Sequence, residues 1–213
     1  MNYAIHNYLE ILAFIFSLIM FSRLRGTYLR FYPALLIITI IAENISIILS
    51  SKYRIFNTSI VYNIFIFLQI IFILGFYLVE TKKNLMFRLY AGFIVTFILF
   101  AITNMFFIQK IYEFNQLTYL LGSLFIIVSS CIFLYQLIEQ IEDESLFTNS
   151  FFWITISNLI FFTGTFFYFL FWYYLVKKNV DNGNLFRSLL TILNIVFYTL
   201  IIIGFLCRKK SLR

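Results

Sequence analysis

The sequence predicts an all-α integral membrane protein, built as one bundle of seven transmembrane helices. Three observations lead to this class. First, 62% of the 213 residues are hydrophobic and 12% are charged, whereas a soluble domain is about 45–50% apolar and about 25% charged. Second, seven apolar stretches reach the roughly 20 residues that a helix needs to cross a hydrocarbon core. Third, the charged residues gather in the breaks between these stretches.

The seven predicted spans are long apolar runs that end at charged or turn-forming residues. They cover residues 3–21, 31–50, 59–79, 86–108, 117–138, 151–176 and 185–206, all within a single domain. Pro33 falls in the first turn of the second span, where its missing N–H costs no helical hydrogen bond. Trp153 and Trp172 of the sixth span are about 28 Å apart along a helix, which fits the two membrane interfaces. The runs lack the polar–apolar alternation that is typical of a transmembrane barrel.

The distribution of Lys and Arg predicts an external N-terminus and a cytoplasmic C-terminus. The breaks expected on the same membrane face as the N-terminus hold 6 of the 16 basic residues. The breaks on the opposite face, together with the C-terminal tail, hold 10. Basic residues favour the cytoplasmic face. Arg23 and Arg25 directly follow the first span and nothing basic precedes it, which is the reverse of a cleavable signal peptide. Lys177, Lys178 and Arg187 lie on the side that the rule disfavours.

Polar side chains in the predicted spans fall along one face of each helix. In the second span, Thr39, Glu43 and Ser46 follow the spacing of four and three that aligns residues on a helical stripe. Asn194 and Tyr198 keep the same kind of spacing in the seventh span. Because lipid tails cannot form hydrogen bonds, we expect these stripes to converge on a polar interior that opens outward.

Glu43 is the central candidate, because an ionisable group near the middle of a bilayer is costly and is by default a functional hypothesis. The residues expected to line a small ligand-binding or proton-coupling cavity are Glu43, Asn63, Gln69, Asn104, Asn194 and Tyr198. The alternative is a structural role, since amides and hydroxyls join membrane helices at about 0.6 kcal/mol per hydrogen bond. A protonated Glu43 can act in the same way. Glu10 is expected to be an interfacial acid, which leaves Glu43 as the one deep acid.

Several classes of function are excluded by what the sequence lacks. The single histidine, His6, lies near the N-terminus, which excludes a His-rich metal site, and no metal or cofactor is predicted. One deep acid provides no carboxylate pair for acid–base catalysis. The basic residues lie at span ends and form no basic domain, which argues against nucleic acid as a partner. The expected partners are the lipid bilayer and a protein that docks on the acidic cytoplasmic run Glu139–Phe147.

Segments in five spans resemble those of a known group of proteins. They are "AEN" in the second span, "VYNIFIFLQIIF" in the third, "LGSLFIIVSS" in the fifth, "FWITISNLIFFTGT" in the sixth and "ILNIVFY" in the seventh. Together they are similar to a group of short seven-helix membrane proteins from bacterial genomes, to which no chemistry is assigned. The resemblance implies a location in the bacterial inner membrane and indicates no substrate.

Three functions follow from these patterns. The favoured one is a membrane-embedded binding or sensory module with a small polar cavity around Glu43. The second is a small proton-coupled transporter or channel, although the broken helices and internal repeats typical of transporters are missing. The third is an intramembrane enzyme that acts on a lipid. A cavity closed towards the inside favours binding, a polar path to both faces favours transport, and a lateral gap at Glu43 favours the enzyme.

Overall fold

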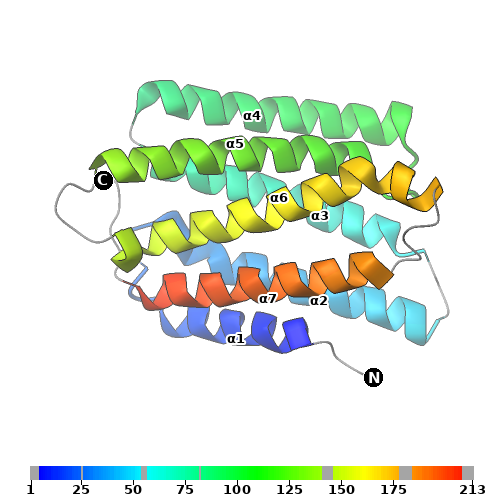
Figure 1. The fold of residues 1–213 in the computed structure, drawn as a ribbon, viewed down its shortest axis with the longest axis horizontal. Helices are drawn as coiled ribbons and strands as arrows, with labels where there is room; N and C mark the ends of the chain where they lie inside the picture. Colours follow the sequence, from blue (N-terminus) through cyan, green and yellow to red (C-terminus); the bar gives the residue numbers. More distant parts are fainter. Residues whose placement is uncertain are drawn as a thin grey trace.

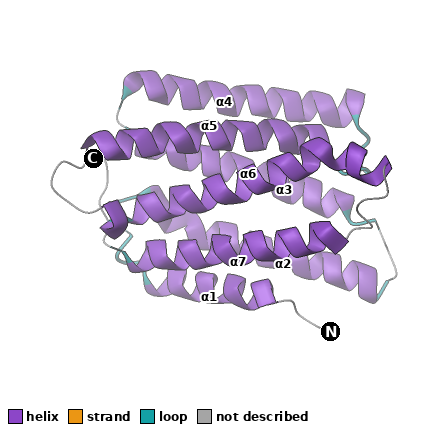
Figure 2. Ribbon diagram, in the orientation of Figure 1, coloured by secondary structure: helices purple, strands orange, loops and turns teal. Residues whose placement is uncertain are grey.

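The computed structural model describes residues 5–24, 26–53, 57–81, 83–140, 146–177 and 184–207. Within these ranges the chain is all-α, with seven α-helices and no β-strand, which confirms the all-α part of the prediction. The helices are α1 Ile5–Ile19, α2 Tyr32–Ser51, α3 Ser59–Glu80, α4 Asn84–Thr103, α5 Gln116–Gln140, α6 Ser150–Lys177 and α7 Asn184–Leu206. They lie roughly parallel to one axis, and successive helices run in opposite directions (Figure 1). Figure 2 shows that loops are confined to the two ends of the bundle.

Six of the helical segments are long and apolar enough to cross a membrane, as expected of a multi-pass membrane protein. They are Tyr28–Ser51, Ser59–Glu80, Asn84–Ile108, Gln116–Glu139, Ser150–Phe171 and Arg187–Leu206. The first predicted span, residues 3–21, is represented by the shorter α1, which has 15 residues. At about 1.5 Å per residue α1 reaches about 22 Å, against a hydrocarbon core of about 30 Å.

A short connection turns the chain from α1 into α2. Gly26 has φ of +82°, a left-handed conformation that glycine adopts without steric cost. The Thr27 hydroxyl donates a hydrogen bond to the Leu24 carbonyl at 2.8 Å, which satisfies both groups where they are buried. Pro33 lies in the first turn of α2, the place in a helix where proline is best tolerated.

Six helices form a closed ring around the interior. Each of α1, α2, α3, α5, α6 and α7 packs against the next, and α7 packs against α1. The remaining helix, α4, lies outside the ring against α3 and α5, at the top edge of the bundle in Figure 1. We call the end at which α1, α3, α5 and α7 begin the cavity end, and the opposite end the aromatic end.

Buried rings fill the interior at the aromatic end. Tyr32 of α2 packs against Phe205 of α7, with ring centroids 5.7 Å apart. Phe76 of α3 packs against Phe133 of α5 at 5.5 Å and against Phe151 of α6 at 5.7 Å. These five side chains are at most 1% exposed. Such ring pairs contribute about 0.5–1.5 kcal/mol each beyond their buried area, so they hold five helices of the ring together.

A polar contact joins three helices just inside these rings. The Tyr77 hydroxyl of α3 shares a hydrogen bond with the Ser130 hydroxyl of α5 at 2.8 Å. It also accepts one from Asn158 Nδ2 of α6 at 3.2 Å. All three residues are at most 1% exposed. Because hydrocarbon offers no alternative partner, these hydrogen bonds act as structural links between helices.

Candidate binding cavity

A cavity of about 600 Å³ lies inside the ring at the cavity end. Its wall is built from α2, α3, α5, α6 and α7, together with Phe114 just before α5. Eight of its 17 lining residues are aromatic. Two lining residues in the first turns of α3 and α7, Tyr62 and Arg187, are exposed, so the cavity reaches the surface there. A volume of this size falls in the range of about 300–1,000 Å³ that small-molecule sites occupy.

Four of the six predicted site residues line this cavity. Glu43 lies on α2, Gln69 on α3, and Asn194 and Tyr198 lie one turn apart on α7. Thr39, one turn before Glu43, lines it as well. The polar stripes of the second and seventh spans therefore meet across the same interior space, and each contributes two side chains to its wall.

Glu10 is a buried interior acid, a role that its prediction as an interfacial acid did not include. It lies on α1, is 2% exposed, and its carboxyl group is hydrogen-bonded to that of Glu43. The reason is the position of α1 in the ring, between α2 and α7, which turns one face of this helix inward. Glu10, Ala13 and Ser17 form that buried face with spacings of three and four, a signal already present in the sequence.

The contact between Glu10 and Glu43 requires a proton. An ionised carboxylate only accepts hydrogen bonds, so two carboxyl groups can be hydrogen-bonded only when at least one of them is protonated. Asn7 Nδ2 donates a further hydrogen bond to Glu43 Oε2 at 3.1 Å. The second oxygen of Glu10, Oε1, is buried and has no hydrogen-bond partner among the described residues. Glu10 and Glu43 thus form one unit that holds a proton beside the cavity.

Two tyrosines face this pair of acids. Tyr198 of α7 is 3% exposed and lies within electrostatic reach of both carboxyl groups and of Tyr32. Tyr62 of α3 lies within reach of Glu43. Both tyrosines line the cavity, as Glu43 does, so two phenol groups and a carboxyl group border the same space.

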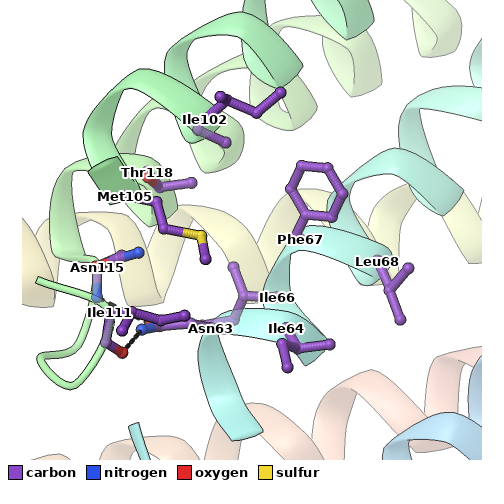
Figure 3. Close-up of a pocket in the computed structure, with 11 residues that line it drawn as sticks. Asn63, Ile64, Ile66, Phe67, Leu68, Ile102, Met105, Ile111, Asn115 and Thr118 are labelled. Carbon is purple, nitrogen blue, oxygen red and sulfur yellow. Dashed lines mark hydrogen bonds between the residues drawn. The ribbon is translucent and has the colours of Figure 1, made fainter. Parts of the chain in front are cut away.

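Asn63 lies outside the wall of this cavity. Its Nδ2 donates hydrogen bonds to the carbonyls of Ile111 at 3.1 Å and Glu113 at 2.8 Å. Its Oδ1 accepts one from the Asn115 N–H at 3.0 Å. Asn63 thereby fastens the loop between α4 and α5, as Figure 3 shows beside a separate, mainly apolar pocket of about 190 Å³.

Asn104 also serves that loop. It is fully buried in the short π-helical segment Asn104–Ile108 that continues α4. Its Nδ2 donates hydrogen bonds to Gln109 Oε1 at 2.9 Å and to Thr118 Oγ1 at 2.8 Å. Because α4 lies outside the ring, its polar face meets α5 and this loop, and it does not reach the cavity.

Another buried acid lies at the aromatic end. Glu80 is the last residue of α3, is 1% exposed, and accepts a hydrogen bond from the Tyr28 N–H at 2.5 Å. The sequence assigns Glu80 to a charged break, so its burial was not predicted. It ties the end of α3 to the turn before α2 and lies outside the cavity wall.

The acidic run Glu139–Phe147, predicted as a docking segment, falls largely outside the described residues, since 141–145 are not among them. At its start, Lys83 Nζ donates a hydrogen bond to Glu139 Oε2 at 2.7 Å, and this bond raises the pKa of Lys83. Both side chains are exposed, so the pair is worth little to stability. At the other end, the Phe147 carbonyl accepts a hydrogen bond from Trp153 Nε1 at 2.7 Å.

The chemistry of the site is inferred from its side chains alone. Among the described residues, no group of three or more His, Cys, Asp or Glu is placed to hold a metal ion. No family model matches the chain, and neither a curated protein nor a solved structure matches it. Its function is therefore inferred from the cavity, the carboxyl pair and the rings at the aromatic end.

Proposed function

We propose that this protein is a membrane-embedded binding module that takes a small, largely apolar ligand into the cavity. An aromatic wall with a few converging polar groups is the usual composition of a small-molecule site, and Glu43, Gln69 and Asn194 supply such groups here. One observation carries the proposal: the interior is open at the cavity end and filled by buried rings at the aromatic end.

The proposal includes an orientation and a location. All seven helices cross the bacterial inner membrane, with the N-terminus outside and the C-terminus in the cytoplasm. The shorter α1 is included because it completes the ring between α2 and α7 and carries Glu10. The cavity then faces outward, where it samples a ligand from outside the cell or from the outer leaflet. A cytoplasmic partner docks on the inner loops, Glu139–Phe147 among them, in this sensory arrangement.

A proton-coupled transporter is the second candidate, and the contact between Glu10 and Glu43 favours it because this pair holds a proton. Transport also requires that the site open alternately to both faces. The packed rings of Phe76, Phe133 and Phe151 block the interior between the cavity and the aromatic end. This supports binding over transport. An enzyme that acts on lipids would need Glu43 at a lateral gap, whereas Glu43 lies on an interior wall.

The test compares two tryptophan substitutions at neighbouring positions of α7. Thr191 lines the cavity, whereas Ile192 points outward and is 62% exposed. The full chain is transferred from expressing cells into nanodiscs. Native mass spectrometry then measures the mass of any small molecule that remains bound to the protein. We expect a stoichiometric adduct on the wild type and on Ile192→Trp that is lost in Thr191→Trp. An adduct that persists in Thr191→Trp would show that the ligand lies elsewhere and would contradict the proposal.

A further inference from the structure

We propose that the ligand is an amphipathic organic cation, and that its binding displaces the proton held between Glu10 and Glu43. This inference rests on the proposed binding function and names the class of ligand. It draws on three independent features of the site: the aromatic wall, the carboxyl pair, and the position of the one cationic lining residue.

The wall of the cavity suits a cation with an apolar body. Aromatic faces attract an ammonium group electrostatically, most strongly when it is desolvated, and the cavity has eight aromatic lining residues. Glu43 adds a carboxyl group on the same wall, and this group contacts that of Glu10. Aromatic faces next to a carboxylate favour an organic cation over an anion or a neutral molecule.

Arg187 is the one cationic side chain among the lining residues, and it lies at the mouth. It is exposed in the first turn of α7, about 16 Å along the helix from Tyr198, which faces the acids. Water and salt screen an exposed charge over a distance of this size. An anion would therefore find one exposed contact at the mouth and two carboxyl groups deeper inside.

The exchange of a cation for a proton keeps the charge of the site constant. When the pair holds one proton, its net charge is −1. After the proton leaves and a monovalent cation binds, two carboxylates and one cation again give −1. A change in buried charge is expensive in a low-dielectric interior, so the cation enters as the proton leaves towards the mouth. Glu10 Oε1, which is buried without a partner, and Glu43 supply the carboxylate oxygens.

The carboxyl pair is the group that we propose gains and loses a proton at this site. Among the side chains that the structure describes, the ionisable groups that face it are Tyr32 from α2, Tyr62 from α3, and Tyr198 from α7, with Arg187 at the mouth. Tyrosine has an ordinary pKa of about 10 and arginine one above about 12, so neither changes charge near pH 7. A pH-dependent affinity that is lost in Glu10→Gln and Glu43→Gln therefore reports the carboxyl pair.

The experiment uses benzyltrimethylammonium, a permanent cation, and neopentylbenzene, its neutral carbon isostere. Each is titrated into the full-length protein in nanodiscs, and the affinity and the protons released into weakly buffered solution are measured together. We expect the cation to release about one proton per molecule bound and its affinity to rise by up to about tenfold per pH unit. The neutral isostere should bind more weakly, with no release of protons and no dependence on pH.

Variants then assign the proton to the pair. Glu43→Gln and Glu10→Gln each keep a hydrogen-bonding side chain and should abolish proton release, while the exposed loop variant Glu113→Gln should match the wild type. Three outcomes would overturn the inference: equal binding of cation and isostere, cation binding without proton release, or unchanged release in Glu43→Gln. Failure of both probes to bind would also overturn it. The proposed binding function is judged separately, by the loss of the native adduct in Thr191→Trp.

Discussion

The Glu10 carboxyl of α1 is hydrogen-bonded to the Glu43 carboxyl of α2 in the interior of the helical ring. Asn7, one turn before Glu10, donates a further hydrogen bond to Glu43. The shortest of the seven helices thus supplies one of the two acids and a donor to the other. The packing of α1 against α2 and α7 is therefore part of the chemistry of the cavity, in addition to closing the ring.

Two glycines test the packing of α4 on the ring. A Cβ added at Gly122 would lie 2.3 Å from Ile70 Cδ1 and 3.0 Å from Phe97 Cε2, whereas one added at Gly92 would have no neighbour within 4 Å. Because Ile70 and Phe97 are fully buried, Gly122→Ala should lower the free energy of unfolding by about 1–3 kcal/mol. Gly92→Ala should leave it unchanged or raise it by up to about 1 kcal/mol. Reversible unfolding in mixed micelles measures both, and equal effects would contradict this packing.

The hydroxyl of Tyr77 should contribute to stability through its contacts with Ser130 and Asn158. At about 0.6 kcal/mol per hydrogen bond in a membrane protein, Tyr77→Phe should cost about 1 kcal/mol. The control is Tyr112→Phe, since Tyr112 is 64% exposed in a loop. The same unfolding assay applies. A Tyr77→Phe protein as stable as the control would show that this contact does not link the three helices.

Asn63 should hold the loop between α4 and α5 and take no part in ligand binding. Asn63→Ala removes the acceptor of the Asn115 N–H and two donors to loop carbonyls, so local opening should become easier by about 1–3 kcal/mol. Hydrogen exchange of residues 109–115 measures this, with Ser50→Ala, which loses one bond within its own helix, as the control. Loss of the bound adduct without faster exchange would instead place Asn63 in the binding site.

The predicted orientation has its own test. A cysteine appended after residue 213, in a chain with Cys131→Ser and Cys207→Ser, should be shielded from an impermeant maleimide in intact cells. It should react once the cells are opened, because the excess of basic residues favours a cytoplasmic C-terminus. Labelling in intact cells would reverse the orientation and turn the cavity towards the cytoplasm.

The spans and the two polar stripes that build most of the cavity follow from periodicity. Length and hydropathy are local properties, and six of the seven predicted spans are found as helices long and apolar enough to cross a membrane. The stripes at Thr39 and Glu43 and at Asn194 and Tyr198 are equally local. Each lines the cavity because α2 and α7 belong to the ring.

The order of the helices around the ring does not follow from periodicity. All the spans are similarly apolar, so the sequence does not reveal that α4 packs outside while α3 contacts α5 directly. The predicted roles of Asn63 and Asn104 assumed a common interior for all seven helices. Glu10 differs in the opposite direction. Its distance from the middle of its span suggested a place at the interface, yet its side chain is buried inside the ring. Position along a helix gives depth in the membrane, whereas burial depends on the neighbours of that helix.

The most direct test of the account is a double-mutant cycle on Glu10 and Glu43. Glu10→Leu, Glu43→Leu and the double variant are compared with the wild type by reversible unfolding. Each single change takes away the acid that the remaining carboxyl group contacts, so we expect each to destabilise the protein and the double variant to recover part of the loss, with a coupling of about 1–3 kcal/mol. Single effects that add to within about 0.5 kcal/mol would show that the two acids do not meet in the ring.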